Sequence, residues 1–206
     1  MRLPRRWDIP APIPVDWMMR DLASAKITVR EREDGRLEQT IEHAVLPGMT
    51  PAMMLWWLAQ LEHPLEWNGR TVLAYRLWHP RDHIYFKVLG TFGPGCRFHV
   101  VEAFGGQRRF LMNWVFDVPK LDATGFRLEI RRLGRPVARI DESYEPVDGG
   151  LRYVVRMLVG GTGRVIGPLS RLIRRTKADT LHAWLRHNVE EVGNLPHVVP
   201  RLFAAR

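Results

Sequence analysis

Two histidines stand four residues apart, beside an aspartate, in the stretch YRLWHPRDHIYF at residues 75–86. His79 precedes Pro80, which interrupts regular strand pairing, so we place His79 in a turn. His83 begins a β-prone run and can point into a sheet interior, where its ring nitrogen is a candidate zinc ligand. Asp82 could orient either ring by a hydrogen bond. The alternative is a packed aromatic strand whose histidines have no chemical role.

A third histidine shares one edge of a predicted C-terminal helix with a carboxylate. Residues 176–195 carry apolar side chains at helical spacing, and Pro196 is expected to end the helix. On a helical wheel His187 and Glu191 lie one turn apart beside the apolar side, whereas Glu190 falls on the side that faces water. Such a pair can bind one cation. An ion pair at the flank of the helix is the commoner meaning of this spacing.

A further carboxylate lies in an otherwise apolar strand. Glu102 shares its strand face with Val100 and Phe104, while His99 points to the opposite face. Burying such a carboxylate is costly unless it is paired or bound to a metal, so Glu102 is either half of a salt bridge or a ligand. Two imidazoles and two carboxylates suit Zn²⁺, and also Mn²⁺ or Fe²⁺. The four candidate ligands are His83, Glu102, His187 and Glu191.

The elements that would position these residues are mostly short strands. β-Prone runs separated by turn signals fill residues 71–158, and SAKITVRERE adds a strand nearer the N-terminus. The seven runs are TVLAYRLW, HIYFKVLG, RFHVVEAFG, RRFLMNWVFDV, GFRLEIRR, RPVARIDESY and GLRYVVRMLV. Between the N-terminal strand and these runs, Thr50 and Pro51 are suited to begin a buried apolar helix. The strand spacing predicts a meandering antiparallel sheet.

A curved antiparallel sheet wrapped around one long C-terminal helix is the helix-grip arrangement, and we predict this α+β fold. Residues 1–45 would form an extension with the first strand, lying against the body through Trp7 and Trp17. Residues 46–206 would form the helix-grip domain that carries the metal site.

Composition limits the classes of function. The net charge is +9. From Leu151 onward the sequence contains ten Lys/Arg and three Asp/Glu, and the densest cluster of basic residues is at residues 170–177. No zinc-finger, RNP or KH pattern accompanies this charge, so we interpret it as a solvated basic face and expect no nucleic-acid partner. A contact with a membrane surface or an acidic partner is the alternative. With one cysteine, Cys96, no disulfide within the chain is possible.

No apolar stretch approaches the roughly 20 residues of a spanning helix, and the basic N-terminus lacks the apolar core of a secretory signal. We therefore expect a soluble, cytoplasmic protein without a membrane span. A homodimer is also plausible.

Five segments, in this order, resemble the 2,4-diacetylphloroglucinol hydrolase family. They are LPGMTPAMMLWWL, YRLWHPRDH, HVVEAFGG, DGGLRYVVRMLVGG and HNVEEVGNLPHVVPRLF. The resemblance implies a Bet v 1-like (START-like) helix-grip domain with one Zn²⁺ per chain. It also implies hydrolysis of the carbon–carbon bond between an acyl group and a polyhydroxylated aromatic ring. Carried over by motif, the zinc ligands fall on the same four residues.

The resemblance also implies substrate contacts. Tyr75 matches a tyrosine that contacts substrate hydroxyls, and Tyr144 is a looser match. Tyr85 or His79 would relay a proton. Two further aromatic residues, Trp78 and Trp184, would contact a small acylphenol substrate.

The sequence leads to one expectation for the zinc ligands and to one alternative function. Because catalytic zinc normally keeps one open position, we expect that one of the two carboxylates binds loosely or that the coordination of the metal expands during turnover. The alternative function is a helix-grip carrier or sensor that binds an aromatic or polyketide ligand without cleaving it.

Overall fold

The computed structural model describes residues 7–132, 134–161 and 178–206. Within them, one nine-stranded antiparallel sheet runs in the order β1-β2-β11-β10-β9-β8-β7-β6, with β3 paired to β11, and β4 and β5 form a separate hairpin. The strands are β1 (Lys26–Glu31), β2 (Leu37–Glu42), β3 (Leu46–Pro47), β4 (Pro64–Trp67), β5 (Arg70–Leu73), β6 (His83–Leu89), β7 (Arg97–Ala103), β8 (Leu111–Asp122), β9 (Gly125–Arg132), β10 (Arg135–Val147) and β11 (Gly150–Val159).

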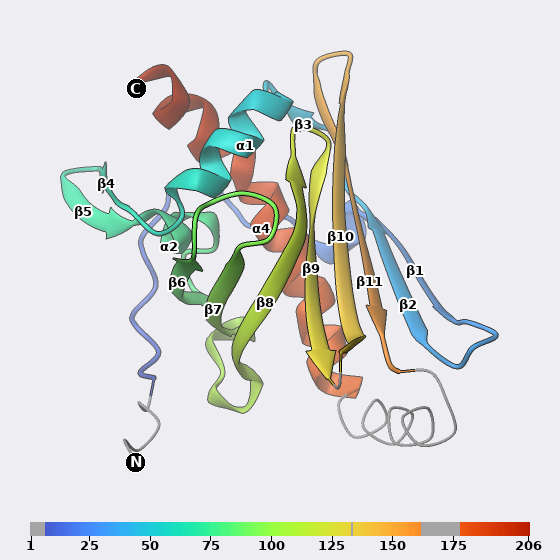
Figure 1. Cartoon of the computed structure of the whole chain (residues 1–206). Helices are drawn as coiled ribbons and strands as arrows, with labels where there is room; N and C mark the ends of the chain where they lie inside the picture. Colours follow the sequence, from blue (N-terminus) through green and yellow to red (C-terminus); the bar gives the residue numbers. More distant parts are fainter. Residues whose placement is uncertain (1–6, 133, 162–177) are drawn as a thin grey trace.

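In the residues that the structure describes, three α-helices and three short 3₁₀ turns accompany the sheet. They are α1 (Pro51–Gln60), α2 (Ala74–Trp78), α4 (Ala178–Ala204), η1 (Leu22–Ser24), η2 (Phe104–Gly106) and η3 (Arg108–Phe110). The long helix α4 lies along one face of the curved sheet, and α1 crosses near one end (Figure 1). Large side chains such as Trp57, Tyr153 and Phe104 are fully buried between these layers. The predicted α+β fold, an antiparallel sheet with a long C-terminal helix in the helix-grip arrangement, is confirmed.

Helix α4 is longer than the sequence predicts, because it continues through Pro196 and Pro200. Each proline removes a backbone hydrogen bond and costs roughly 3 kcal/mol in a helix interior. Val198 and Val199 are buried in this extension, and Leu195 is buried just before it. Each such side chain contributes about 1.5–3 kcal/mol on burial. Packing therefore offsets the prolines, and the predicted end at Pro196 is wrong.

The run TVLAYRLW is not one strand. It leaves β5 at Leu73 and forms the short helix α2, whose Ala74, Tyr75, Leu77 and Trp78 are buried. The alternation of aromatic and aliphatic residues suits a strand, but burial on nearly all sides also suits one helical turn. Periodicity alone cannot separate these two states in so short a run.

The N-terminal segment lies against the body through two tryptophans, as predicted. The indole N–H of Trp17 donates to the side-chain oxygen of Asn194 on α4 at 2.8 Å. The ring of Trp7 lies 4.9 Å from that of Tyr85. Residues 26–42 contribute β1 and β2 to the same sheet as the rest of the chain.

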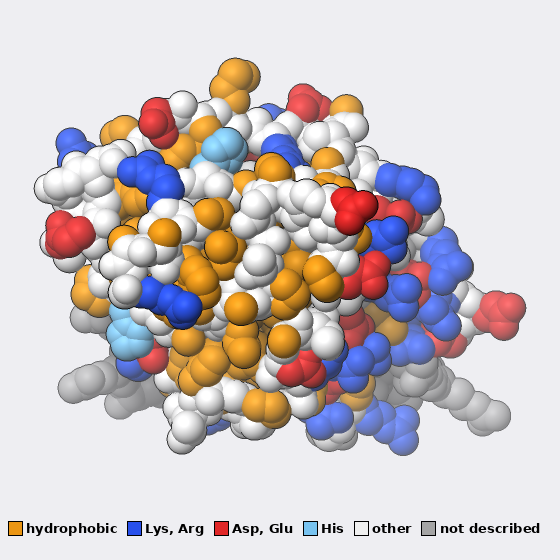
Figure 2. Space-filling view, turned by 90° about the horizontal axis from the view of Figure 1, so that it is seen from above, with side chains coloured by type: hydrophobic (Ala, Val, Ile, Leu, Met, Phe, Trp, Pro, Cys, Tyr) orange, Lys and Arg blue, Asp and Glu red, His pale blue; other side chains and the backbone are white. Residues whose placement is uncertain are grey.

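The arginines of the sheet are interspersed with acidic partners. Arg127 and Arg139 both contact Asp141, while Arg30 and Arg32 both contact Glu38. Figure 2 shows basic and acidic side chains alternating at the right of the face seen from above, beside a region of hydrophobic side chains. The basic cluster at residues 170–177 and most of the glycine-rich segment before it lie outside the described residues. In the described part of the chain, no helix is long and apolar enough to cross a membrane.

We expect Thr50→Ala to lower the free energy of unfolding by about 1 kcal/mol, because an N-cap hydroxyl satisfies a free helical N–H. The Thr50 hydroxyl accepts from the backbone N–H of Met53 at 3.2 Å. Thr50→Ser keeps the hydroxyl and is the matched control. Denaturant unfolding of both variants measures the effect, and equal losses in the two would contradict the capping role.

Candidate metal centre

The imidazole of His83 is held with one nitrogen free. His83 is the first residue of β6 and is fully buried. Its Nδ1–H donates to the carbonyl oxygen of Tyr75 at 2.8 Å, and its ring stacks on that of Tyr75 with centroids 3.8 Å apart. The other nitrogen, Nε2, is buried and has no hydrogen-bond partner among the residues that the structure describes. Burial lowers the pKa of His83 well below its usual value. The lone pair of Nε2 is therefore available to a cation.

His187 on α4 is arranged in the same way. Its Nδ1–H donates to the carboxylate of Asp82 at 3.0 Å, which leaves Nε2 directed at the carboxylates of Glu191 and Glu102. Burial alone would lower the pKa of His187, but the negative charges of Glu191 and Asp82 raise it to about 9. An imidazole anchored at Nδ1 by a carboxylate is the usual geometry of a metal-bound histidine.

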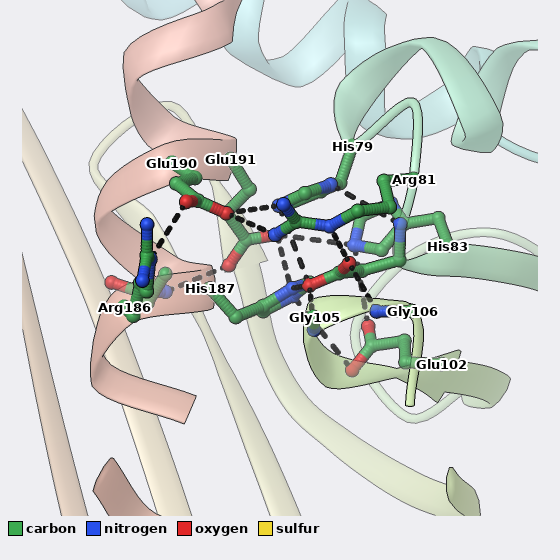
Figure 3. Close-up of polar contacts among 12 residues, drawn as sticks. His79, Arg81, His83, Glu102, Gly105, Gly106, Arg186, His187, Glu190 and Glu191 are labelled. Atoms are coloured by element: carbon green, nitrogen blue, oxygen red, sulfur yellow. Dashed lines mark hydrogen bonds and ion pairs between the residues drawn. The ribbon is translucent and has the colours of Figure 1, made fainter. Parts of the chain in front are cut away.

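Two carboxylates complete the cluster. Antiparallel pairing of β6 with β7 sets His83 opposite Glu102, and Nε2 of His83 lies 3.4 Å from Oε1 of Glu102. Nε2 of His83 lies 3.3 Å from Oε2 of Glu191. Figure 3 shows the two glutamates reaching this point from different elements, β7 and α4. The structure thus brings all four predicted ligands together.

The spacing of these atoms suits a small tetrahedral cation. Nε2 of His187 lies 3.6 Å from Glu191 Oε2 and 3.9 Å from Glu102 Oε2. Ligand atoms at about 2.0–2.1 Å from a tetrahedral zinc ion stand roughly 3.3 Å apart. Three of the residues, His83, His187 and Glu191, have ligand atoms that all lie within 4.8 Å of one another. Buried clusters that could bind a metal are therefore present.

Asp82 is the residue that fixes His187. Its carboxylate also accepts from Arg81 Nε at 2.8 Å and from the backbone N–H groups of Gly105 and Gly106 at 2.9 and 3.1 Å. Both glycines have positive φ, a conformation that costs them little, and it turns two successive amides toward the carboxylate. Although burial raises the pKa of Asp82, its hydrogen bond with His187 and the nearby charges lower it overall. Asp82 therefore stays ionised, and the ring it orients is that of His187.

Glu190 corrects a prediction. It was expected to face water, yet it is buried, because the turn between α2 and β6 covers this side of α4. Its carboxylate accepts from His79 Nε2 at 3.1 Å, Arg81 Nη2 at 2.6 Å and Arg186 Nε at 3.0 Å (Figure 3). The helical wheel identifies the apolar side of α4 correctly, but it cannot show that polar residues, His79 and Arg81, cover the other side.

A second group, His79, Asp82 and His187, also meets the distance criterion for a metal. Both nitrogens of His79 are occupied, since Nε2 contacts Glu190 and Nδ1 accepts from the backbone N–H of Asp82 at 3.3 Å. Arg81 already supplies a positive charge to Asp82. The side chains of this group already have hydrogen-bond or ion-pair partners, so the group supports the candidate metal centre beside it. His79 has no free nitrogen for a proton relay.

Tyr85 lies away from the cluster. A shift of strand register between His83 and Tyr85 turns the chain, so Phe86 is buried beside Tyr75 while Tyr85 packs against Trp7 and His99. Tyr85, one of the two residues predicted to relay a proton, therefore does not share the face of His83, because the alternation of a regular strand does not survive an irregularity.

The other four residues predicted to contact substrate have distinct positions. The Tyr75 hydroxyl donates to Glu102 Oε1, and Trp78 packs edge-on to His83 with its buried indole N–H unpartnered among the described residues. The Tyr144 hydroxyl donates to the carbonyl oxygen of Asp122 at 3.0 Å, so its hydrogen is already used. The fourth, Trp184, is buried on α4.

Sequence reasoning missed Asn188, Glu142 and Tyr153. Asn188 donates to Glu191 Oε1 at 2.7 Å and fixes that carboxylate. Its polar side chain on an apolar helix side, three residues before Glu191, was the available signal. Glu142 and Tyr153 carry no comparable signal, because their strands alternate polar and apolar residues like any half-exposed strand.

Comparisons with known proteins show no family for this chain. No protein-family model matches the chain, and a search of curated proteins found no match. Among solved structures, protein Ms6760 from Mycobacterium smegmatis is 15% identical with a TM-score of 0.47, covering 88% of this chain and 100% of its own. Ara h 8.0201 is 14% identical with a TM-score of 0.40, covering 75% of this chain and 96% of its own. Such distant likenesses carry no functional argument.

Proposed function

We propose that this chain is a zinc-dependent hydrolase that cleaves the carbon–carbon bond between an acyl group and a phenolic ring. One observation carries the proposal: two buried imidazoles, each anchored at Nδ1, direct Nε2 at two carboxylates within 3.3–3.9 Å. The resemblance of five sequence segments to the 2,4-diacetylphloroglucinol hydrolase family supports the choice of reaction.

The zinc ligands in this proposal are His83, Glu102, His187 and Glu191. When bound, zinc polarises a carbonyl group and lowers the pKa of a water molecule. Glu191 is fixed by Asn188, whereas Glu102 is the more exposed carboxylate and its Oε2 lies farthest from His187. Glu102 is therefore the ligand that binds more loosely and leaves room for substrate.

In this proposal Tyr75 orients the phenol of the substrate. Because its hydroxyl hydrogen is donated to Glu102, its oxygen lone pairs accept from a donor such as a ring hydroxyl. Burial and the charge of Glu102 raise the pKa of Tyr75 well above its usual value, so it stays protonated. Trp78 adds a buried indole N–H without a partner among the described residues.

The test combines metal analysis with turnover. Protein purified without chelators is expected to hold about one zinc per chain and to convert an acylphloroglucinol to a carboxylic acid and the free phenol, detected by chromatography. Glu191→Gln is expected to lose both properties. Glu145→Gln, an exposed carboxylate of β10 paired with Arg152, is the control that keeps both.

Two results would redirect the proposal. Zinc retained with the acylphenol recovered intact would favour the carrier or sensor function. A wild-type chain that binds no zinc, even when zinc is added, would remove the reason for proposing an enzyme.

A further inference from the structure

A buried carboxyl group lies apart from the four candidate zinc ligands. Glu142 is on β10, and the hydroxyl of Tyr153 on β11 donates to its Oε2. Glu142 is 6% exposed and Tyr153 is fully buried. Oε1 of Glu142 has no hydrogen-bond partner among the described residues, so one oxygen is held and the other is available.

The pair is connected to the metal cluster through α4. The ring of Tyr153 meets that of His43 edge-on at 5.8 Å, and Nε2 of His43 lies 3.2 Å from the side-chain oxygen of Asn188. Asn188 in turn holds Glu191. In the register of β10 and β11, Glu142 lies opposite Val155, which is fully buried in the core, so Glu142 faces the same interior.

Glu142 is the carboxyl group of this interior that keeps its proton. Glu102 and Glu191 each lie against imidazole nitrogens, whereas in the described part of the chain Glu142 contacts no Lys, Arg or His. Carboxylates that share a buried region cannot all ionise without opposite charges. Burial and the nearby Glu191 raise the pKa of Glu142 to about 8. Because Tyr153 donates to Oε2, the proton resides on Oε1.

We propose that Glu142, held by Tyr153, is the proton donor of the reaction and delivers its Oε1 proton to the ring carbon as the acyl group leaves. This inference rests on the proposed function. The water oxygen bonds to the acyl carbon, the carbon–carbon bond breaks, and its electron pair stays on the ring carbon, which takes the proton. The proton released by the water restores Glu142. The products are a carboxylic acid and a ring that carries hydrogen in place of the acyl group.

Tyr153 allows Glu142 to lose its proton and to be protonated again. After proton transfer the carboxylate is ionised in a buried place, and the hydrogen bond from Tyr153 stabilises that form. The ring of Tyr144 lies 5.5 Å from that of Tyr153 and fixes its position.

The test compares Glu142→Gln with Glu145→Gln on the same strand, in the zinc-loaded full chain. Glu142→Gln is expected to keep its zinc and its KM and to lose about 10²–10⁴-fold in kcat, the usual contribution of a general acid. Infrared spectra at neutral pH are expected to show a protonated-carboxyl band in the wild type that Glu142→Gln lacks. Glu145→Gln should match the wild type throughout.

Three results would overturn the role of Glu142 alone: undiminished kcat in Glu142→Gln, loss of its zinc, or no protonated-carboxyl band in the wild type. Should Glu142→Gln fail to fold, Tyr153→Phe keeps the carboxyl group and is expected to lower kcat with zinc retained; an unchanged kcat would also overturn the role. A wild type that binds zinc but cleaves no acylphenol overturns the proposed function itself. The two failures are thus distinguishable.

Discussion

Replacing His83 by alanine is expected to abolish stoichiometric zinc binding, whereas His99→Ala on the neighbouring strand should leave it intact. The Nε2 of His83 faces two carboxylates and has no other partner in the described part of the chain, while His99 lies on the opposite face of β7 and contacts Asn113 at 2.8 Å. Loss of a residue that merely orients a ligand costs about 10–100-fold in metal affinity. Loss of a ligand itself should exceed that range.

Metal analysis of both purified variants, followed by zinc titration against a competing chelator, measures this difference. Because His83 is fully buried, circular dichroism and thermal unfolding must show that His83→Ala is folded before its metal content is interpreted. A folded His83→Ala chain that binds zinc as tightly as the wild type would contradict the assignment. Equal losses in both variants would point to a general effect on the sheet.

Three of the four candidate ligands, His187, Glu191 and Glu102, could be predicted because the argument for each used a local periodicity that the fold preserves. His187 and Glu191 are one helical turn apart, and α4 is regular over both. Glu102 lies on an inward face because β7 alternates without interruption. The pairing of His83 with Glu102 depends on strand register, which the sequence does not reveal.

The wrong predictions arise where packing overrides local pattern. An irregularity after His83 turns Tyr85 outward, and buried side chains carry α4 past Pro196. Glu190 faces the turn of residues 79–82, which lies more than a hundred positions away in sequence. A helical wheel describes one helix and holds no information on such a partner. Buried ion networks of this kind therefore emerge only from the assembled structure.

Replacing either of the adjacent glutamates on α4, Glu190 or Glu191, by glutamine is expected to change the free energy of unfolding in opposite ways. Glu190→Gln should lower the free energy of unfolding of the chelator-treated protein by about 1.5–3 kcal/mol, the range for hydrogen bonds to a charged group. The carboxylate of Glu190 is held by Arg81, His79 and Arg186. The loss of stability stays within this range because neither arginine is left buried without a partner. Arg81 still donates to Asp82, and the Arg186 side chain is 68% exposed to water.

Glu191→Gln should instead leave the zinc-free protein as stable as the wild type or more so. Burial raises the pKa of Glu191, so its ionised form costs stability at neutral pH and a neutral amide removes that cost. Burial raises the pKa of Glu190, but its hydrogen bonds and the charge of Arg81 lower this pKa overall. The stability that ionised Glu190 contributes is therefore present at neutral pH and is lost as the pH falls through the pKa of Glu190 in the folded protein. With zinc present the order reverses, since only Glu191→Gln forfeits the stabilisation that a bound ligand gives. Denaturant unfolding with and without zinc measures both effects, and parallel behaviour of the two variants would mean that the centre and the ion network are one structural unit.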